Sequence, residues 1–179
     1  MSLKWALVDG IILSVLISIV VLGSIYADPR MWVDDYPPDI QAAVGPVQTP
    51  PGQVIVGGVF FAAAVVGVPL WSNARLRRRN HGKLSFWAAF ANSALLFFVF
   101  AVWDLLVLDW LLFVTIRPSF MVIPGTEGLA GYKDYWFHFR VSFLGWVQWA
   151  SILAAGLVMA GLSMIRIGGR REDGPRGVY

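Results

Sequence analysis

Four long apolar stretches separated by polar segments dominate this chain, and none of them contains a lysine or arginine. The hydrocarbon core of a bilayer is about 30 Å thick, and a helix crosses it with roughly 20 residues. The pattern therefore predicts an all-α membrane protein, a four-transmembrane-helix bundle with helices at about 5–26, 54–72, 84–116 and 140–165. Pro69 is expected to bend or end the second helix, because proline cannot donate a backbone hydrogen bond.

Composition supports the membrane as solvent. Of 179 residues, 58% are hydrophobic and 14% charged, whereas about a quarter of the residues of a soluble domain are charged. The length suits one membrane domain, 1–179. The first stretch is interpreted as an uncleaved helix, because only Lys4 precedes it and 25–27 match a cleavage site poorly. The absence of cysteine excludes disulfides and thiolate chemistry.

Lysine and arginine predict the orientation, because they concentrate on the cytoplasmic side of membrane proteins. Ten of the fourteen lie before the first helix, in the loop 73–83 or after the fourth helix, and the other four are Arg30, Arg117, Lys133 and Arg140 on the opposite side. We therefore expect a multi-pass protein of the cell (cytoplasmic) membrane with both termini cytoplasmic. The basic loop determines topology on the simplest interpretation, and anionic lipid head groups or a partner are the alternative. The tail 168–179 is expected to be flexible.

The third apolar stretch is longer than a bilayer requires. It runs to Ile116, interrupted only by Asp104 and Asp109, and would be about 50 Å long as one helix. Its outer part needs cover from water, and the outer loops 27–53 and 117–139 can supply it. We therefore expect a structured extracytoplasmic cap over an extended third helix. In this cap Pro124-Gly125 suits a type II turn, and Asp39 is a candidate N-cap of a short helix.

Several segments resemble a family of small, uncharacterised four-helix membrane proteins of bacteria and archaea. The resemblance spans most of the chain and rests on these stretches: 35–41 (Asp-Tyr-Pro-Pro-Asp-Ile-Gln), 108–111 (Leu-Asp-Trp-Leu), 123–128 (Ile-Pro-Gly-Thr-Glu-Gly), 131–135 (Gly-Tyr-Lys-Asp-Tyr) and 137–139 (Phe-His-Phe). The resemblance implies the four-helix topology and directs attention to the outer cap. It implies no activity.

The candidate binding residues share a position in or beside the cap, where acids near a membrane helix suggest a function: Asp104, Asp109, Glu127, Tyr132, Lys133, Asp134, His138 and Arg140. Asp104 and Asp109 lie about 140° apart on an α-helix, so they are not expected to share a proton. The simplest interpretation pairs them with Arg117, Lys133 or Arg140. A metal site with His138 is a weaker alternative, and the sequence identifies no cofactor.

Polar residues deep in the helices are few. Asn92 and Gln148 are expected to form an interhelical hydrogen bond, and the lack of a richer polar path argues against a transporter. Small residues recur every four positions on each helix, for example Gly10, Ser14 and Ser18. Such ridges fit packing within the bundle, a protein partner or a homo-oligomer. The charge distribution does not indicate a nucleic-acid partner.

Three functions remain open. The leading hypothesis is a non-catalytic binding or accessory subunit whose cap contacts a partner, a lipid or a small ligand. The first alternative is a membrane-embedded enzyme acting on a lipid or isoprenoid at the outer interface, which requires Asp109, Glu127 and His138 to converge on one cavity. The second is a transporter component that acts as an oligomer. Common enzyme motifs, such as a phosphate-binding loop or His-Glu-x-x-His, do not occur in the sequence.

Overall fold

A computed structural model describes residues 3–48 and 51–165, and every regular element within them is helical. Four helical runs in this part of the chain are long and apolar enough to cross a membrane: Leu3–Ala27, Pro51–Arg79, Phe86–Ile116 and Trp146–Met164. The predicted all-helical class and the predicted number of long apolar helices are thereby confirmed. The tail 168–179 lies outside the described residues.

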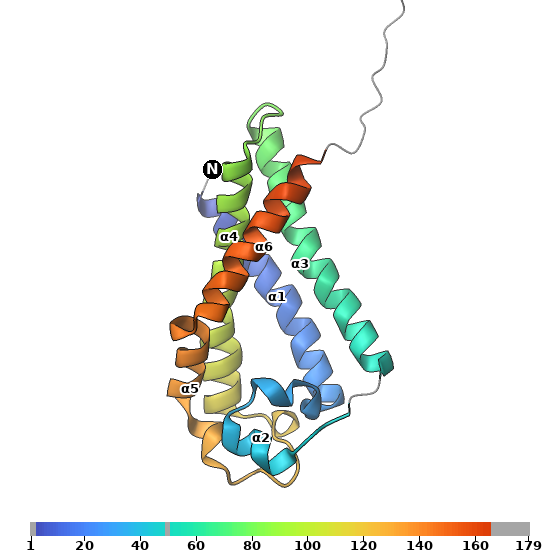
Figure 1. The fold of residues 1–179 in the computed structure, drawn as a ribbon, viewed down its shortest axis with the longest axis vertical. Coiled ribbons are helices and arrows are strands. Elements are labelled where there is room, and N and C mark those ends of the chain that lie inside the picture. The colour runs from blue at the N-terminus through green and yellow to red at the C-terminus, as the bar shows by residue number, and fades with distance from the viewer. Residues whose placement is uncertain (1–2, 49–50, 166–179) are drawn as a thin grey trace, which may run out of the picture.

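The long helices are α1 (Leu3–Ala27), α3 (Pro51–Arg79), α4 (Phe86–Trp103) with its continuation η2 (Asp104–Ile116), and α6 (Trp146–Met164). The short elements are η1 (Pro29–Asp35), α2 (Pro38–Val44), η3 (Ser119–Met121), η4 (Ala130–Lys133), α5 (Tyr135–Phe139) and η5 (Arg140–Leu144). Figure 1 shows the short elements gathered at one end of the bundle, apart from α5 and η5, which run alongside η2 into α6. The opposite end, where α3 ends and α4 begins, is called the basic end below.

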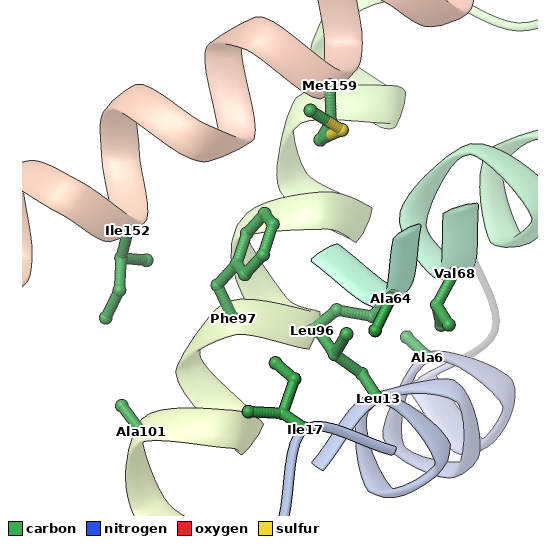
Figure 2. Close-up of a cluster of buried hydrophobic side chains, with 10 residues drawn as sticks. All are labelled: Ala6, Leu13, Ile17, Ala64, Val68, Leu96, Phe97, Ala101, Ile152 and Met159. Carbon is green, nitrogen blue, oxygen red and sulfur yellow. The ribbon is translucent and has the colours of Figure 1, made fainter. Parts of the chain in front are cut away.

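Helix α4 lies at the centre of the bundle and packs against both α1 and α6. Leu13 and Ile17 of α1 pack in one hydrophobic cluster with Leu96 and Phe97 of α4. Ile152 of α6 belongs to the same cluster (Figure 2). Helices approach closely where a residue lacks a side chain: a Cβ built on Gly10 would lie 2.7 Å from Val99 Cβ. Such close contacts between small and large residues supply the packing that lipid-immersed helices need, because apolar side chains gain little by leaving lipid.

Helix α3 extends further than predicted, and Pro69 does not end it. Pro69 is buried inside the helix, which continues to Arg79 instead of stopping near residue 72. The helix ends where His81 and Gly82 take positive φ angles of 52° and 82°, a conformation that suits glycine. Arginine and leucine are good helix formers, so the basic segment prolongs the helix and the loop shortens to 80–85.

The fourth long helix begins at Trp146 and not at residue 140. Residues 135–144 form the separate helical segments α5 and η5, and Gly145 follows in an extended conformation with φ −76° and ψ 129°. A Cβ on Gly145 would lie 3.0 Å from the carbonyl oxygen of Val141. The chain therefore breaks at the one residue of this segment without a side chain.

The two long connections, which run from α1 to α3 and from η2 to α5, pack against the end of η2. We call this hydrophobic group the loop cluster; its buried members are Ile25, Val33, Tyr36, Ile40, Phe113, Val114, Met121, Ile123 and Tyr132. Tyr36 Oη donates to the carbonyl of Met121 at 2.9 Å, and the amide of Ile123 donates to Tyr132 Oη at 2.9 Å. These bonds tie residues far apart in sequence into one ordered unit.

Two local predictions for these connections can be compared with the structure. Gly125 has φ +87°, as the type II turn requires. Asp39 is not an N-cap, because Pro37 occupies that position and Asp39 lies within the first turn of α2. Its carboxylate instead accepts a hydrogen bond of 2.8 Å from the amide of Gly131. A Cβ at Gly131 would lie 2.2 Å from that carboxylate, so the contact depends on glycine.

Candidate functional site

One of the polar contacts between η2 and α5 joins Asp109 and His138. Asp109 Oδ1 lies 3.2 Å from His138 Nδ1. Asp134 caps α5 by accepting from the amide of Phe137 at 2.8 Å, and this local bond orients the short helix that carries His138. Asp109 and His138 were both predicted as site residues, and the structure brings them together.

The His138 side chain is enclosed by aromatic rings. The rings of Phe113 and Phe137 lie edge-on to it, with centroids 5.0 and 5.3 Å away. Its side chain is 6% exposed, and among the described residues Nε2 has no hydrogen-bond partner. A buried polar nitrogen without a partner is unfavourable, so this nitrogen is the unsatisfied group of the site.

Two further carboxylates lie near this pair. The Asp109 and Asp35 carboxylates contribute to the electrostatic environment of Asp104. Loss of solvation, with the nearby Asp34 and Asp109 carboxylates, raises the pKa of Asp35 above its ordinary value of 3.8. We call Asp35, Asp104, Asp109 and His138 the carboxylate–histidine group. Sequence reasoning did not select Asp35, because only the fold of the first connection places it beside η2.

The angle predicted between Asp104 and Asp109 is wrong because η2 is a π-helix. In a π-helix each backbone amide bonds to the carbonyl five residues earlier, so a turn holds more residues than in an α-helix. The value of about 140° holds only for an α-helix. The separation of Asp104 and Asp109 around the helix axis is therefore smaller than predicted.

The ion pairs predicted for these acids are also not formed. Among the described residues, His138 is the single basic partner of Asp109, and Asp104 and Asp35 have none. Arg117 instead donates to the backbone carbonyls of Val114 and Tyr132, at 2.9 and 2.8 Å. It thereby closes the end of η2, because terminal helix carbonyls need donors from outside the helix.

The remaining predicted residues serve local structure or face solvent. Tyr132 is fully buried in the loop cluster, and its hydroxyl bonds to Thr126 Oγ1 at 2.8 Å. Glu127 accepts from the amide of Gly125 at 2.9 Å, and this bond lowers the pKa of Glu127. Lys133 and Arg140 are exposed. Glu127 therefore does not join Asp109 and His138, and within the described residues no group of three or more His, Asp or Glu side chains could hold a metal ion.

A second polar group, which the sequence analysis missed, lies near the basic end. Asn92 Nδ2 donates to Ser72 Oγ at 2.9 Å and to Asn73 Oδ1 at 3.0 Å, rather than to the predicted partner Gln148. Ser72 Oγ donates to Asp9 Oδ2 at 2.6 Å, and Arg75 also binds that oxygen. Asn73 Nδ2 donates to the hydroxyls of Ser93 and Ser163 at 2.9 Å each.

This polar network connects all four long helices, since Asp9 belongs to α1, Asn73 to α3, Asn92 to α4 and Ser163 to α6. Asp9 is 1% exposed, and its second oxygen has no partner among the described residues. Asp9, Ser72 and Asn92 line a cavity of about 20 Å³, large enough for one water molecule. The sequence did contain a signal, because each of these helices carries a polar side chain close to the same end.

Comparison with protein-family models, with curated proteins and with solved structures found no match to this chain. Its function must therefore be argued from its own residues.

Proposed function

We propose that this chain is a non-catalytic binding or accessory subunit of the cytoplasmic membrane, with both termini in the cytoplasm and the loop cluster forming an extracytoplasmic cap. The carboxylate–histidine group is its binding site, and the partner or ligand presents positive charge there. The observation that carries this proposal is the imbalance of charge: within the described residues, no lysine or arginine pairs with Asp35, Asp104 or Asp109.

Physical reasoning supports a positively charged partner. Carboxylates that repel each other at the edge of an apolar bundle destabilise the protein unless something neutralises them. A lysine or arginine side chain of another subunit, or a cationic ligand, would relieve that repulsion and could satisfy the polar atoms of the group. Electrostatic complementarity of this kind determines which partner binds and in which orientation.

The test compares the species that co-purify with the full-length protein in mild detergent, identified by native mass spectrometry. Asp104→Asn removes one negative charge without breaking an observed hydrogen bond, and we expect it to reduce the co-purifying species about tenfold, roughly 1.4 kcal/mol. Glu127→Gln is the matched control, since Glu127 is an exposed acid outside the carboxylate–histidine group, and glutamine keeps the oxygen that accepts from the Gly125 amide. Equal yields from the wild type and both variants would refute the proposal.

The enzymatic alternative draws support from one observation, the contact of Asp109 with His138. A carboxylate that holds one ring nitrogen can orient the other nitrogen as a general base. That second nitrogen, Nε2, is buried, so this function would require the aromatic cover to open for a lipid or isoprenoid substrate. Turnover of an added lipid that His138→Gln abolishes would favour the enzyme over the binding subunit.

The transporter alternative has less support. The polar network provides the buried polar groups that the sequence analysis did not find, but the network lies near the basic end. Leu13, Ile17, Leu96 and Phe97 separate it from the carboxylate–histidine group. A transport path through a single copy would have to cross this apolar core.

A further inference from the structure

An apolar groove runs along the outside of the bundle between α1 and α3. Two adjoining hollows form it, of about 500 and about 540 Å³, and they share Ile19, Val20 and Phe60. Between Pro51 and Ala63 no residue of α3 is buried, so the half of α3 nearer the loop cluster is the less covered one. The hollow nearer the basic end runs from Phe60 to Trp71 along α3 and is lined by Leu16, Ile19, Val20, Phe60, Ala63, Ala64, Gly67, Val68 and Trp71.

The length of this hollow matches one leaflet of a bilayer. Phe60 and Trp71 are eleven residues apart, about 16 Å along a helix at 1.5 Å per residue. Half of a 30 Å hydrocarbon core is about 15 Å. An acyl chain that begins beside Trp71 would therefore reach the middle of the membrane near Phe60, without leaving the groove.

A basic and aromatic group lies at the Trp71 end. The Arg75 guanidinium lies 4.5 Å from the centroid of the Trp71 ring and 5.0 Å from that of Trp5, and Arg79 lies 4.2 Å from the Trp5 ring. Asp9 pairs with Arg75, whereas Arg79 is exposed and has no carboxylate partner among the described residues. Tryptophan and arginine at this depth are typical of the level of lipid head groups.

At the other end of the groove, the described residues include no such free cation. Met31 lines the hollow there, and the neighbouring Arg30 donates to both oxygens of Asp28 at 2.9 and 2.8 Å. Its charge is thereby compensated, so an anionic group would gain little at that end. The charge of the groove is therefore asymmetric, with the uncompensated Arg79 over the Trp5 ring near the end marked by Trp71.

We propose that the groove between α1 and α3 binds one anionic phospholipid, with its phosphate at Arg79 and an acyl chain along Gly67 and Ala63 toward Phe60. The match of groove length to one leaflet selects an acyl chain, and the free positive charge of Arg79 selects an anionic head group. This site is independent of the carboxylate–histidine group, which lies at the opposite end of the bundle.

The test places the full-length protein in nanodiscs containing equal amounts of phosphatidylglycerol and phosphatidylcholine, and native mass spectrometry then counts the lipids that each protein retains. The wild type is expected to keep one phosphatidylglycerol. Arg79→Gln should weaken retention about fivefold, since one arginine near an anionic surface contributes about 1 kcal/mol. Arg78→Gln is the matched control, because Arg78 is exposed but contacts neither tryptophan ring.

A second pair of variants tests the acyl chain. A Cβ at Gly67 or at Gly161 meets no atom within 4 Å, but only Gly67 lines the groove. Gly67→Leu should fill the groove and reduce lipid retention, and Gly161→Leu on α6 should not. Equal retention of the two lipids, or equal effects within either pair of variants, would overturn the proposal. So would retention of a second copy of the chain, or of another protein, in place of the lipid.

Discussion

Asp9 and Arg75 form a buried ion pair whose two members differ in their access to water. The Asp9 side chain is 1% exposed and the Arg75 side chain 21%. If Asp9 loses its charge, Arg75 can extend its long side chain toward the membrane surface. If Arg75 is removed, the Asp9 carboxylate stays enclosed without a cation. The two single substitutions should therefore have unequal effects, although they break the same contact.

We expect Arg75→Leu to lower the free energy of unfolding by about 3 kcal/mol, because it leaves a buried charge uncompensated. Asp9→Asn should lower it by less, and the double variant Asp9→Asn/Arg75→Leu should be more stable than Arg75→Leu alone. Unfolding by sodium dodecyl sulfate in mixed micelles measures these differences. Additive effects in the double variant would show that the pair does not act as a unit.

At the scale of the helices, a glycine contributes to close packing only where it faces a neighbouring helix. Gly10 and Gly23 both belong to α1. Gly10 faces Val99 of α4 at a distance that leaves no room for a side chain, whereas a Cβ at Gly23 meets nothing within 4 Å. A glycine-to-alanine substitution at each of these two positions therefore distinguishes the effect of helix propensity on stability from the effect of helix packing.

Gly10→Ala should lower the free energy of unfolding by about 1–3 kcal/mol, because overpacking forces α1 away from α4. Gly23→Ala should leave stability unchanged or raise it by up to about 1 kcal/mol, because alanine favours the helix. The same detergent unfolding assay compares the two variants. If both destabilise the protein equally, the contact between Gly10 and Val99 does not limit packing.

The sequence predicted those features of the helices that depend on the run of apolar residues within each segment. Apolar runs indicated the four long helices, but they could not indicate the break at Gly145 or the π-helix of η2. Both depend on how the backbone is held by contacts outside its own segment, such as the bond of Trp110 Nε1 to the carbonyl of Tyr135. The mutual position of Asp104 and Asp109 was therefore misjudged.

The partner of Asn92 could have been found from topology. Asn92 lies near the start of α4, and Gln148 lies near the start of α6. These two helices run in opposite directions (Figure 1), so their starts lie at opposite ends of the bundle. Counting depth from a common end would have grouped Asn92 with Asp9, Asn73 and Ser163, which is the network that the structure shows.

For the molecule as a whole, the polar contacts at the basic end and the open groove between α1 and α3 are structurally related. The polar network and the Asp9–Arg75 pair join α1 and α3 near the basic end, whereas toward the loop cluster α3 has no buried residue before Ala64. Small residues and apolar side chains line the groove there. Hydrogen bonds thus stabilise the basic end of the bundle. At the other end, the loop cluster packs against η2 and α1.

The proposed orientation of the molecule can be tested directly, because the sequence contains no cysteine and a single introduced thiol gives an unambiguous label. Asn80 and Glu127 are both exposed. Asn80 follows the last residue of α3, at the basic end, and Glu127 lies between η3 and η4, among the short elements at the other end. Since positive charge favours the cytoplasmic side, a membrane-impermeant maleimide should modify Glu127→Cys in intact cells and Asn80→Cys only after permeabilisation. Full labelling of both variants in permeabilised cells is the control for reactivity. The reverse pattern would place the carboxylate–histidine group in the cytoplasm, and its partner would then have to be sought there.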